Sequence, residues 1–146
     1  MIYLLDTDTI IFILQGVKST ADRQRRSRAR KILAKLRSER QLKHTIGVSA
    51  ITISELEYGC RNSGQYHQEL RYLARVLRYL TRLPFDETSC PNHYGQVKYA
   101  LKLQGRIIGV MDLLIAAHAL SFSATLVTNN TAHFNRVPGL KTVNWN

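Results

Sequence analysis

The sequence predicts an α/β fold in which helices cover both faces of a parallel sheet. Two observations lead to this prediction. Several short segments are apolar without interruption, which is typical of strands buried on both faces. Longer amphipathic segments lie between them, as expected of helices that connect parallel strands. The chain has 146 residues and shows no repeat or linker, so we expect a single domain over residues 1–146.

The first third of the chain alternates a strand, two helices and a second strand. Residues 2–5 are wholly apolar and predict the first strand. A helix is expected to begin between residues 7 and 9 and to end at Gly16, since glycine commonly terminates helices. Residues 22–43 predict a long helix, because apolar residues from Ala29 to Leu36 recur at helical spacing. Residues 46–49 predict the second strand.

Four more helices and up to three more strands complete the pattern. A helix opens at Thr52, and residues 65–82 repeat the amphipathic spacing. Residues 83–85 predict a brief strand or turn, and residues 87–104 a helix that Gly105 ends. The remaining expected elements are a mostly apolar helix at 111–122 and strands at 125–128 and 141–145.

The charge of the chain points to a polyanionic partner. Lysine and arginine number 21 against 10 acidic residues, which gives a net charge of +11. Between Lys18 and Lys43, eleven residues are basic and two are acidic. A second basic stripe recurs at helical spacing and comprises Arg71, Arg75, Arg78 and Arg82. Such surfaces attract nucleic acid, although a solvated helix face is the plainer alternative.

Several classes of protein are excluded. No apolar run approaches the ~20 residues that span a bilayer. The start of the chain lacks the basic segment of a secretory signal, and Cys60 and Cys90 lack metal-binding or disulfide-scaffold spacing. No glycine-rich phosphate loop is present. We therefore expect a cytoplasmic protein with reduced thiols and no membrane partner.

Three acidic residues stand at the ends of expected elements, beside apolar stretches. Asp6 follows the first strand, Glu55 lies in the first turn of the helix after the second strand, and Asp112 opens the apolar helix. Ligand sites of open α/β sheets lie at the carboxyl ends of strands. A carboxylate in apolar surroundings requires a compensating cation, and converging carboxylates bind Mg²⁺. The acids therefore predict a metal site.

Each acid also has a purely structural interpretation. Asp6 could cap the following helix, and the negative charge of Asp112 could be stabilised by the dipole of the helix that it opens. Thr52 and Glu55 have the spacing of a capping box. If the acids were only caps, the chain would be a non-catalytic basic module that binds RNA or DNA. Asp6-Thr7-Asp8 also matches the opening of haloacid-dehalogenase-like phosphatases, but the later acidic pair of those enzymes is absent.

Four ordered segments resemble the motifs of PIN-domain ribonucleases, and in particular of VapC-type toxins. They are Tyr3-Leu4-Leu5-Asp6-Thr7-Asp8, the segment from Ser49 to Gly59, Met111-Asp112-Leu113-Leu114-Ile115-Ala116-Ala117-His118-Ala119, and the segment from Leu126 to Leu140. The resemblance implies a three-layer α/β/α sandwich with a short central parallel sheet. It also implies Mg²⁺- or Mn²⁺-dependent cleavage of RNA, a homodimer and inhibition by a cognate VapB-type antitoxin.

The resemblance also implies the roles of individual residues. Asp6, Glu55 and Asp112 match the catalytic acids, and Asp6 and Asp112 would hold the metal ion. Asp8 stands where the family usually has asparagine, and Asn130 or His133 stands where it usually has a fourth acid. Asp8 and Asn130 are therefore candidate accessory residues. Apart from the resemblance, the charge of the two basic stretches predicts the residues that contact RNA, namely Arg23, Arg26, Arg30, Arg71, Arg75 and Arg78.

Overall fold

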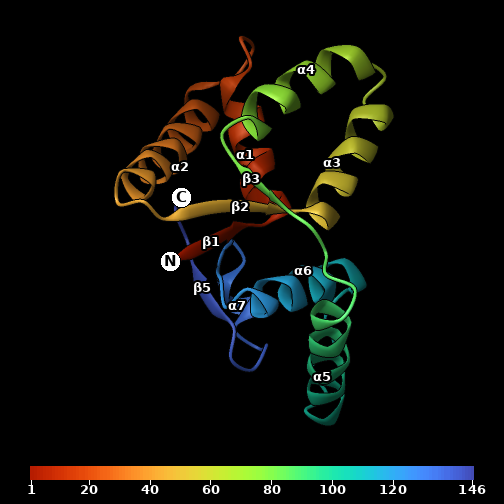
Figure 1. The fold of residues 1–146 in the computed structure, drawn as a ribbon. Coiled ribbons are helices and arrows are strands. Elements are labelled where there is room, and N and C mark those ends of the chain that lie inside the picture. The colour runs from red at the N-terminus through yellow and green to blue at the C-terminus, as the bar shows by residue number, and fades with distance from the viewer.

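The computed structural model describes all 146 residues and contains a five-stranded, wholly parallel sheet of order β3-β2-β1-β4-β5 (Figure 1). The strands are β1 (Ile2–Leu5), β2 (Thr45–Ser49), β3 (Thr81–Leu83), β4 (Thr125–Val127) and β5 (Lys141–Val143). The helices are α1 (Thr7–Val17), α2 (Arg23–Gln41), α3 (Ala50–Asn62), α4 (Tyr66–Leu77), α5 (Ser89–Leu103), α6 (Val110–Ser121) and α7 (Thr131–Phe134). No helix combines the length and the apolarity needed to cross a bilayer.

The helices form two layers, one on each face of the sheet. Helices α1 to α4 lie on one side and α5 to α7 on the other (Figure 1). The central strand β1 shows why its sequence is apolar throughout: Tyr3 and Leu5 join the core beneath α1 to α4, whereas Leu4 joins the core beneath α5 to α7. Alternate side chains of a strand point to opposite faces, so both faces need apolar residues. The predicted three-layer α/β/α fold is confirmed.

Helix α1 continues past the residue that was expected to stop it. Gly16 lies inside α1, where a Cβ atom would collide with the Cβ of Ala29 on α2. Glycine is therefore required there by the close approach of two helices, and it does not terminate the helix. The prediction that the helix ends at Gly16 is wrong for this reason.

The segment predicted as one helix over residues 65–82 divides into a helix and a strand. Helix α4 ends at Leu77, and Thr81–Leu83 forms the edge strand β3 against β2. Gly47 of β2 lets this strand approach, because a Cβ there would lie 2.7 Å from Leu83 Cδ1. Arg82 is therefore a strand residue, and the predicted four-arginine helical stripe ends at Arg78, the C-cap of α4. The apolar residues and the arginines keep helical spacing as far as residue 82 by chance, but pairing with β2 makes the last of these residues a strand.

Candidate active site

The carboxyl ends of β1 and β4 form the centre of the candidate site. The sheet order places β2 and β3 on one side of β1, and β4 and β5 on the other. Ligands of open α/β sheets bind at such a reversal of strand order, beyond the carboxyl ends. Asp6 follows β1 and Thr128 follows β4, and both are buried. The backbone N–H of Asp6 donates to the carbonyl of Val127 over 3.0 Å, which joins the two strand ends.

Asp6 is the N-cap of α1, but this role does not account for its surroundings. Its Oδ1 accepts a 2.8 Å hydrogen bond from the backbone N–H of Thr9. The residue is only 4% exposed, and none of the ion pairs of the chain includes it. Burial raises the pKa of the Asp6 carboxyl, hydrogen bonds from Thr128 and Thr9 oppose the rise, and the charge of Asp8 adds to it. A buried carboxylate without a cationic partner fits a bound metal ion.

Glu55 reaches from the second turn of α3 to the start of α1. The hydroxyl of Thr7 donates a 2.6 Å hydrogen bond to Glu55 Oε1. The predicted capping box is wrong, because β2 leads directly into α3 and Ser49 is the N-cap, accepting from the N–H of Ile51 over 3.0 Å. Thr52 is already inside the helix and is buried. Glu55 is therefore free of a capping role, and its contact with Thr7 brings it to the edge that carries Asp6.

Asp112 lies in the first turn of α6 and contacts a histidine from α7. His133 Nε2 is 3.0 Å from Asp112 Oδ2, and the two side chains are 23% and 42% exposed. The short helix α7 was not expected from the sequence. It begins beside β4, so it brings His133 across the sheet edge to a residue 21 positions earlier in the chain.

The two candidate accessory residues lie at the rim of the site. Asp8 is exposed in the first turn of α1 and makes no hydrogen bond or ion pair through its side chain, although its charge acts on Asp6. Asn130 is also exposed and is the N-cap residue of α7. Its backbone N–H donates to the hydroxyl of Thr128 over 3.0 Å, while its side chain forms no capping bond. Both side chains are open to solvent beside the buried carboxylate.

The structure thus places Asp6, Glu55 and Asp112 at one edge of the sheet. No three histidine, cysteine or acidic side chains lie close enough to ligate one ion directly. Mg²⁺ usually takes one or two protein carboxylates and completes its shell with water and substrate oxygens, so this arrangement fits such an ion. Sequence reasoning missed Thr7 and Thr128 and the contact of His133 with Asp112. The sequence did carry a signal for the two threonines: Thr7 directly follows the first acid, and Thr128 directly follows a strand.

Comparison with known proteins decides the family. The family described as PIN domain matches residues 3–140 of this chain. The chain belongs to the PIN-domain family. Among curated relatives, it is 36% identical to Ribonuclease VapC2 of Rickettsia felis, over 99% of this chain and 98% of that protein. It is 32% identical to the tRNA(fMet)-specific endonuclease VapC of Salmonella typhimurium, over 98% and 97% of the two chains.

Solved structures of VapC proteins share the fold of this PIN domain. A chain from the crystal structure of VapBC2 from Rickettsia felis, bound to a DNA fragment from their promoter, superposes with a TM-score of 0.84 at 33% identity, and the match covers 100% of both chains. A chain from the structure of VapBC-1 from nontypeable Haemophilus influenzae gives a TM-score of 0.82 at 34% identity, over 99% of this chain and 98% of that one. Within the PIN-domain family, the chain is a VapC-type protein.

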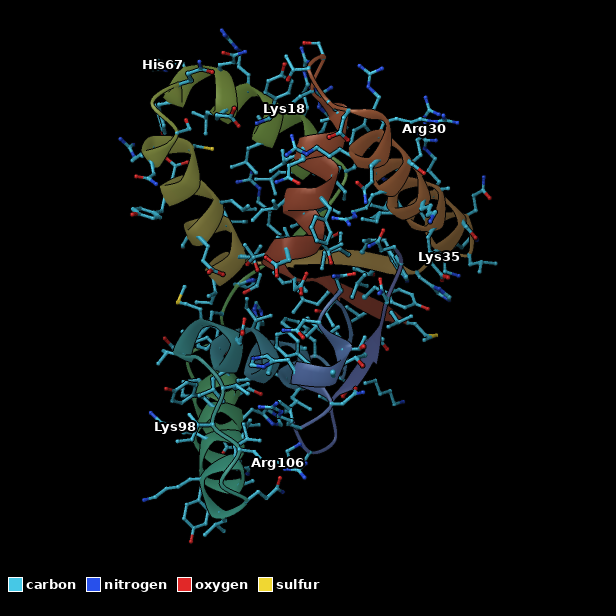
Figure 2. The ribbon with its side chains drawn as sticks, turned by 180° about the vertical axis from the view of Figure 1, so that it is seen from behind. Lys18, Arg30, Lys35, His67, Lys98 and Arg106 are labelled. Atoms are coloured by element: carbon cyan, nitrogen blue, oxygen red, sulfur yellow. The ribbon has the colours of Figure 1, made fainter.

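Helix α2 carries most of the helical basic residues of this PIN domain, and α4 carries Arg71 and Arg75. All six arginines expected to contact RNA are exposed: Arg23, Arg26, Arg30, Arg71, Arg75 and Arg78. Figure 2 shows Arg30 pointing outward from α2, and Lys98 and Arg106 on the opposite helical layer. None of the six forms an ion pair with an acidic residue. Their guanidinium groups are therefore available to phosphates or to an acidic protein.

A groove with a volume of about 690 Å³ separates α2 from α4. Its floor and walls are apolar and include Ile13 and Val17 of α1, Leu33 and Leu36 of α2, and Tyr72 and Val76 of α4. Arginines also line the groove, namely Arg37, Arg40, Arg75 and Arg78. An apolar groove lined by cations is complementary to an amphipathic helix with acidic flanks.

Proposed function

We propose that Asp6, Glu55 and Asp112 of this VapC-type ribonuclease form a divalent-metal site that hydrolyses RNA phosphodiester bonds. The observation that carries the proposal is Asp6, a buried carboxylate without a cationic partner, at the reversal of strand order. Asp6 and Asp112 would hold Mg²⁺ or Mn²⁺. When bound, such an ion polarises a phosphate oxygen and lowers the pKa of a water molecule toward neutral pH.

Other side chains orient the catalytic acids and bind the RNA. Thr7 donates to Glu55 Oε1, and the other carboxylate oxygen, which has no hydrogen-bond partner, would orient water or take its proton. Thr9 and Thr128 hold the Asp6 carboxylate in one orientation. The arginines of α2 and α4 hold the RNA backbone through its phosphates, because one guanidinium group can donate two parallel hydrogen bonds to a phosphate.

The groove between α2 and α4 is the proposed site for the VapB-type antitoxin. Its apolar lining, which includes Leu33 and Tyr72, would receive the apolar face of a helical segment, and the arginines Arg37, Arg40, Arg75 and Arg78 its acidic flanks. A basic antitoxin side chain would satisfy Asp6 and Asp112 by charge-assisted hydrogen bonds and so compete with the metal ion. The chain and its antitoxin would then form an inactive complex.

A second copy of the chain has a surface available on the opposite layer. Large apolar residues are exposed around α5 and the start of α6: Tyr99, Leu103, Ile107, Val110 and Met111. Contiguous exposed apolar surface usually marks a protein interface. We therefore expect a homodimer, which light scattering on the purified chain would detect and which Leu103→Asp would weaken.

The proposal is tested by cleavage assays on Asp6→Asn and Asp112→Asn. Both variants should lose cleavage of RNA, because asparagine removes the negative charge that holds the cation. Transfer RNA is the first substrate to test, since two VapC relatives are named as tRNA(fMet)-specific endonucleases. Asp22→Asn is the matched control: Asp22 is also an N-cap aspartate, accepting from the N–H of Arg25, but it lies exposed at the start of α2. If Asp6→Asn and Asp112→Asn cleave RNA as well as Asp22→Asn does, these acids are structural and the proposed site is wrong. If the unmodified chain binds RNA but does not cleave it, the chain is a non-catalytic binding module.

A further inference from the structure

A second pocket lies between α2 and the C-terminal end of the chain, which Figure 1 shows beside this helix. Its volume is about 530 Å³, and it shares no residue with the groove between α2 and α4. No apolar side chain lines it. We call it the α2 pocket, and its lining residues are Arg23, Gln24, Ser27, Arg28, Lys31 and Asn146.

The α2 pocket gathers three cations and no acid. Arg23, Arg28 and Lys31 form no ion pair with any carboxylate of the chain. Arg28 and Lys31 are three residues apart on α2, so their charges repel one another across one face of the helix. An anion in the pocket would relieve this repulsion and would also receive hydrogen bonds from the neutral donors that line it.

Arg28 is held in place by an aromatic ring. Its Cζ lies 4.3 Å from the centre of the Phe12 ring of α1. Arg28 is therefore partly buried, whereas Arg23 and Lys31 are exposed. Stacking uses the face of the guanidinium group and leaves the N–H groups of its edge available to a ligand. The pocket thus contains one cation whose position is fixed before any anion binds.

Two connections place the α2 pocket beside the carboxyl edge of the sheet. On one side, Phe12 follows Asp8 by four residues on α1, which is ~6 Å along the helix axis. On the other side, Nδ2 of Asn146 donates to Oδ1 of Asn129 over 3.1 Å. Asn129 directly follows Thr128, whose side chain hydrogen-bonds to Asp6. A strand of RNA at Asp6 therefore has a short path to the pocket.

We infer that the α2 pocket binds a phosphate group of the RNA strand outside the linkage that is cleaved, and so positions single-stranded RNA along the carboxyl edge of the sheet. The inference rests on the proposed function, because the strand in the pocket is the substrate of that site. Guanidinium and ammonium groups with neighbouring neutral donors match the charge and the acceptor oxygens of a phosphate. Such contacts fix the register of a nucleic acid without reading its sequence.

Ser27→Glu tests the inference by adding a carboxylate inside the α2 pocket. Ser27 is four residues from both Arg23 and Lys31, so the new charge can pair with either and supports the helix while it repels phosphate. Fluorescence anisotropy with labelled single-stranded oligouridylate, in a chelator that prevents cleavage, should show about tenfold weaker binding, the scale of one charge-assisted contact. The log–log salt slope should fall by about 0.7 units. In cleavage assays, KM should rise and kcat should stay unchanged.

Ser38→Glu is the matched control for this variant. Ser38 is exposed on the same helix but outside the α2 pocket, and the substitution makes the same change in net charge. The control should keep the affinity and the salt slope of the unmodified chain. Equal losses in the two variants would show a general effect of charge, and the inference would then be wrong.

Nuclear magnetic resonance of the unmodified chain gives a measurement that does not depend on the folding of any variant. The side-chain Nε–H resonance of Arg28 should shift when oligouridylate is added, and at higher concentrations when inorganic phosphate is added. A shift with inorganic phosphate alone would mean that the pocket binds free phosphate and not RNA. That result, or no shift with either probe, would overturn the inference.

The possible results separate this inference from the proposed function. If Ser27→Glu binds and cleaves RNA as Ser38→Glu does, the inference is wrong, while the site of Asp6 and Asp112 stands. If Asp6→Asn and Asp112→Asn cleave RNA normally, the proposed catalytic site is wrong. The anisotropy measurement is made without metal, so it still decides whether the α2 pocket binds RNA.

Discussion

His118 of α6 and Ser49 of β2 are hydrogen-bonded in the core, with 2.7 Å between Nδ1 and Oγ. Both residues are completely buried. Ser49 is also the N-cap of α3, the helix that carries Glu55, so the pair connects α6 with the start of α3. His118 is therefore a hydrogen-bonded residue of the core.

Burial lowers the pKa of His118, which makes the stability of the fold dependent on pH. Because the unfolded chain binds a proton near pH ~6.5 and the folded chain resists it, the free energy of unfolding should fall as the pH drops below that value. His118→Gln keeps a hydrogen-bonding group but cannot be protonated. Urea unfolding should show the unmodified chain to be more stable at pH 8, with a difference that narrows toward pH 5. A constant difference over this range would contradict the assignment.

Asp6→Asn should leave the melting temperature of the metal-free protein unchanged or raise it. Burial raises the pKa of Asp6, so its ionised form is destabilising at neutral pH, and this cost grows as the pH rises through the folded-state pKa. Asparagine removes the charge and still caps a helix well. Differential scanning calorimetry with a chelator measures the effect. Thr9→Val is a useful comparison, because it removes a hydroxyl that donates to the carbonyl of Val127 and should lower the melting temperature.

Glu55→Gln separates a chemical role from a structural one. Glutamine can still accept the hydrogen bond from Thr7, so the free energy of unfolding should change little. It cannot take a proton, so single-turnover cleavage should slow by roughly 10²–10⁴-fold, the range typical of a lost general base. Thr7→Val leaves the carboxylate in place without its orienting donor, and we expect a smaller loss. Normal cleavage by Glu55→Gln would assign Glu55 to structure alone.

A triple variant in which glutamine replaces Arg71, Arg75 and Arg78 should bind RNA more weakly. The affinity of this variant for RNA should also depend less steeply on salt concentration. Each lost phosphate contact removes about 0.7 units of slope on a log–log plot for single-stranded RNA, so three contacts correspond to about two units. Fluorescence anisotropy over a range of salt concentrations measures the slope.

The matched control for this experiment removes the same charge from the other helical layer. Lys98, Lys102 and Arg106 are exposed on α5 and in the loop that follows it. Their replacement by glutamine should leave the slope unchanged. Equal effects of the two triple variants would mean that RNA responds to the net charge of the chain and not to the surface of α4.

Leu33→Asp should release the enzyme from its antitoxin without impairing cleavage. Leu33 is partly exposed in the groove between α2 and α4, so a charge there opposes the docking of an apolar helix face at little cost to the core. Pull-down and calorimetry with the cognate antitoxin should show weaker binding, and growth should slow even when both proteins are expressed. Leu103→Asp on α5, outside the groove, should bind the antitoxin normally. If both variants bind it equally, the antitoxin docks elsewhere.

Local pattern was sufficient for β1, β2 and β4 and for the position of Asp6 at the end of β1. The apolar run from Ile2 to Leu5 predicted a strand buried on both faces, and the alternation of Leu4 and Leu5 between the two cores shows why. The same logic located Asp6, since an acid that ends such a strand must lie at the carboxyl edge of the sheet. These inferences succeeded because burial and strand direction are expressed in neighbouring residues.

Other features depend on residues that are distant in sequence. The end of α4 at Leu77 is decided by the pairing of Thr81–Leu83 with β2, which helical spacing does not register. The start of α3 at Ser49 cancels the capping box of Thr52 and Glu55, because the preceding strand sets where the helix begins.

The sequence by itself determined that this chain has a parallel sheet between two helical layers, with three acids at element ends. Only the tertiary structure decided that Thr7 orients Glu55 and that His133 meets Asp112. The physical reason is that side-chain periodicity reports how each residue is buried locally. Contacts such as these arise when loops and sheet order bring separate elements together, and a single sequence carries no periodic signal for that step.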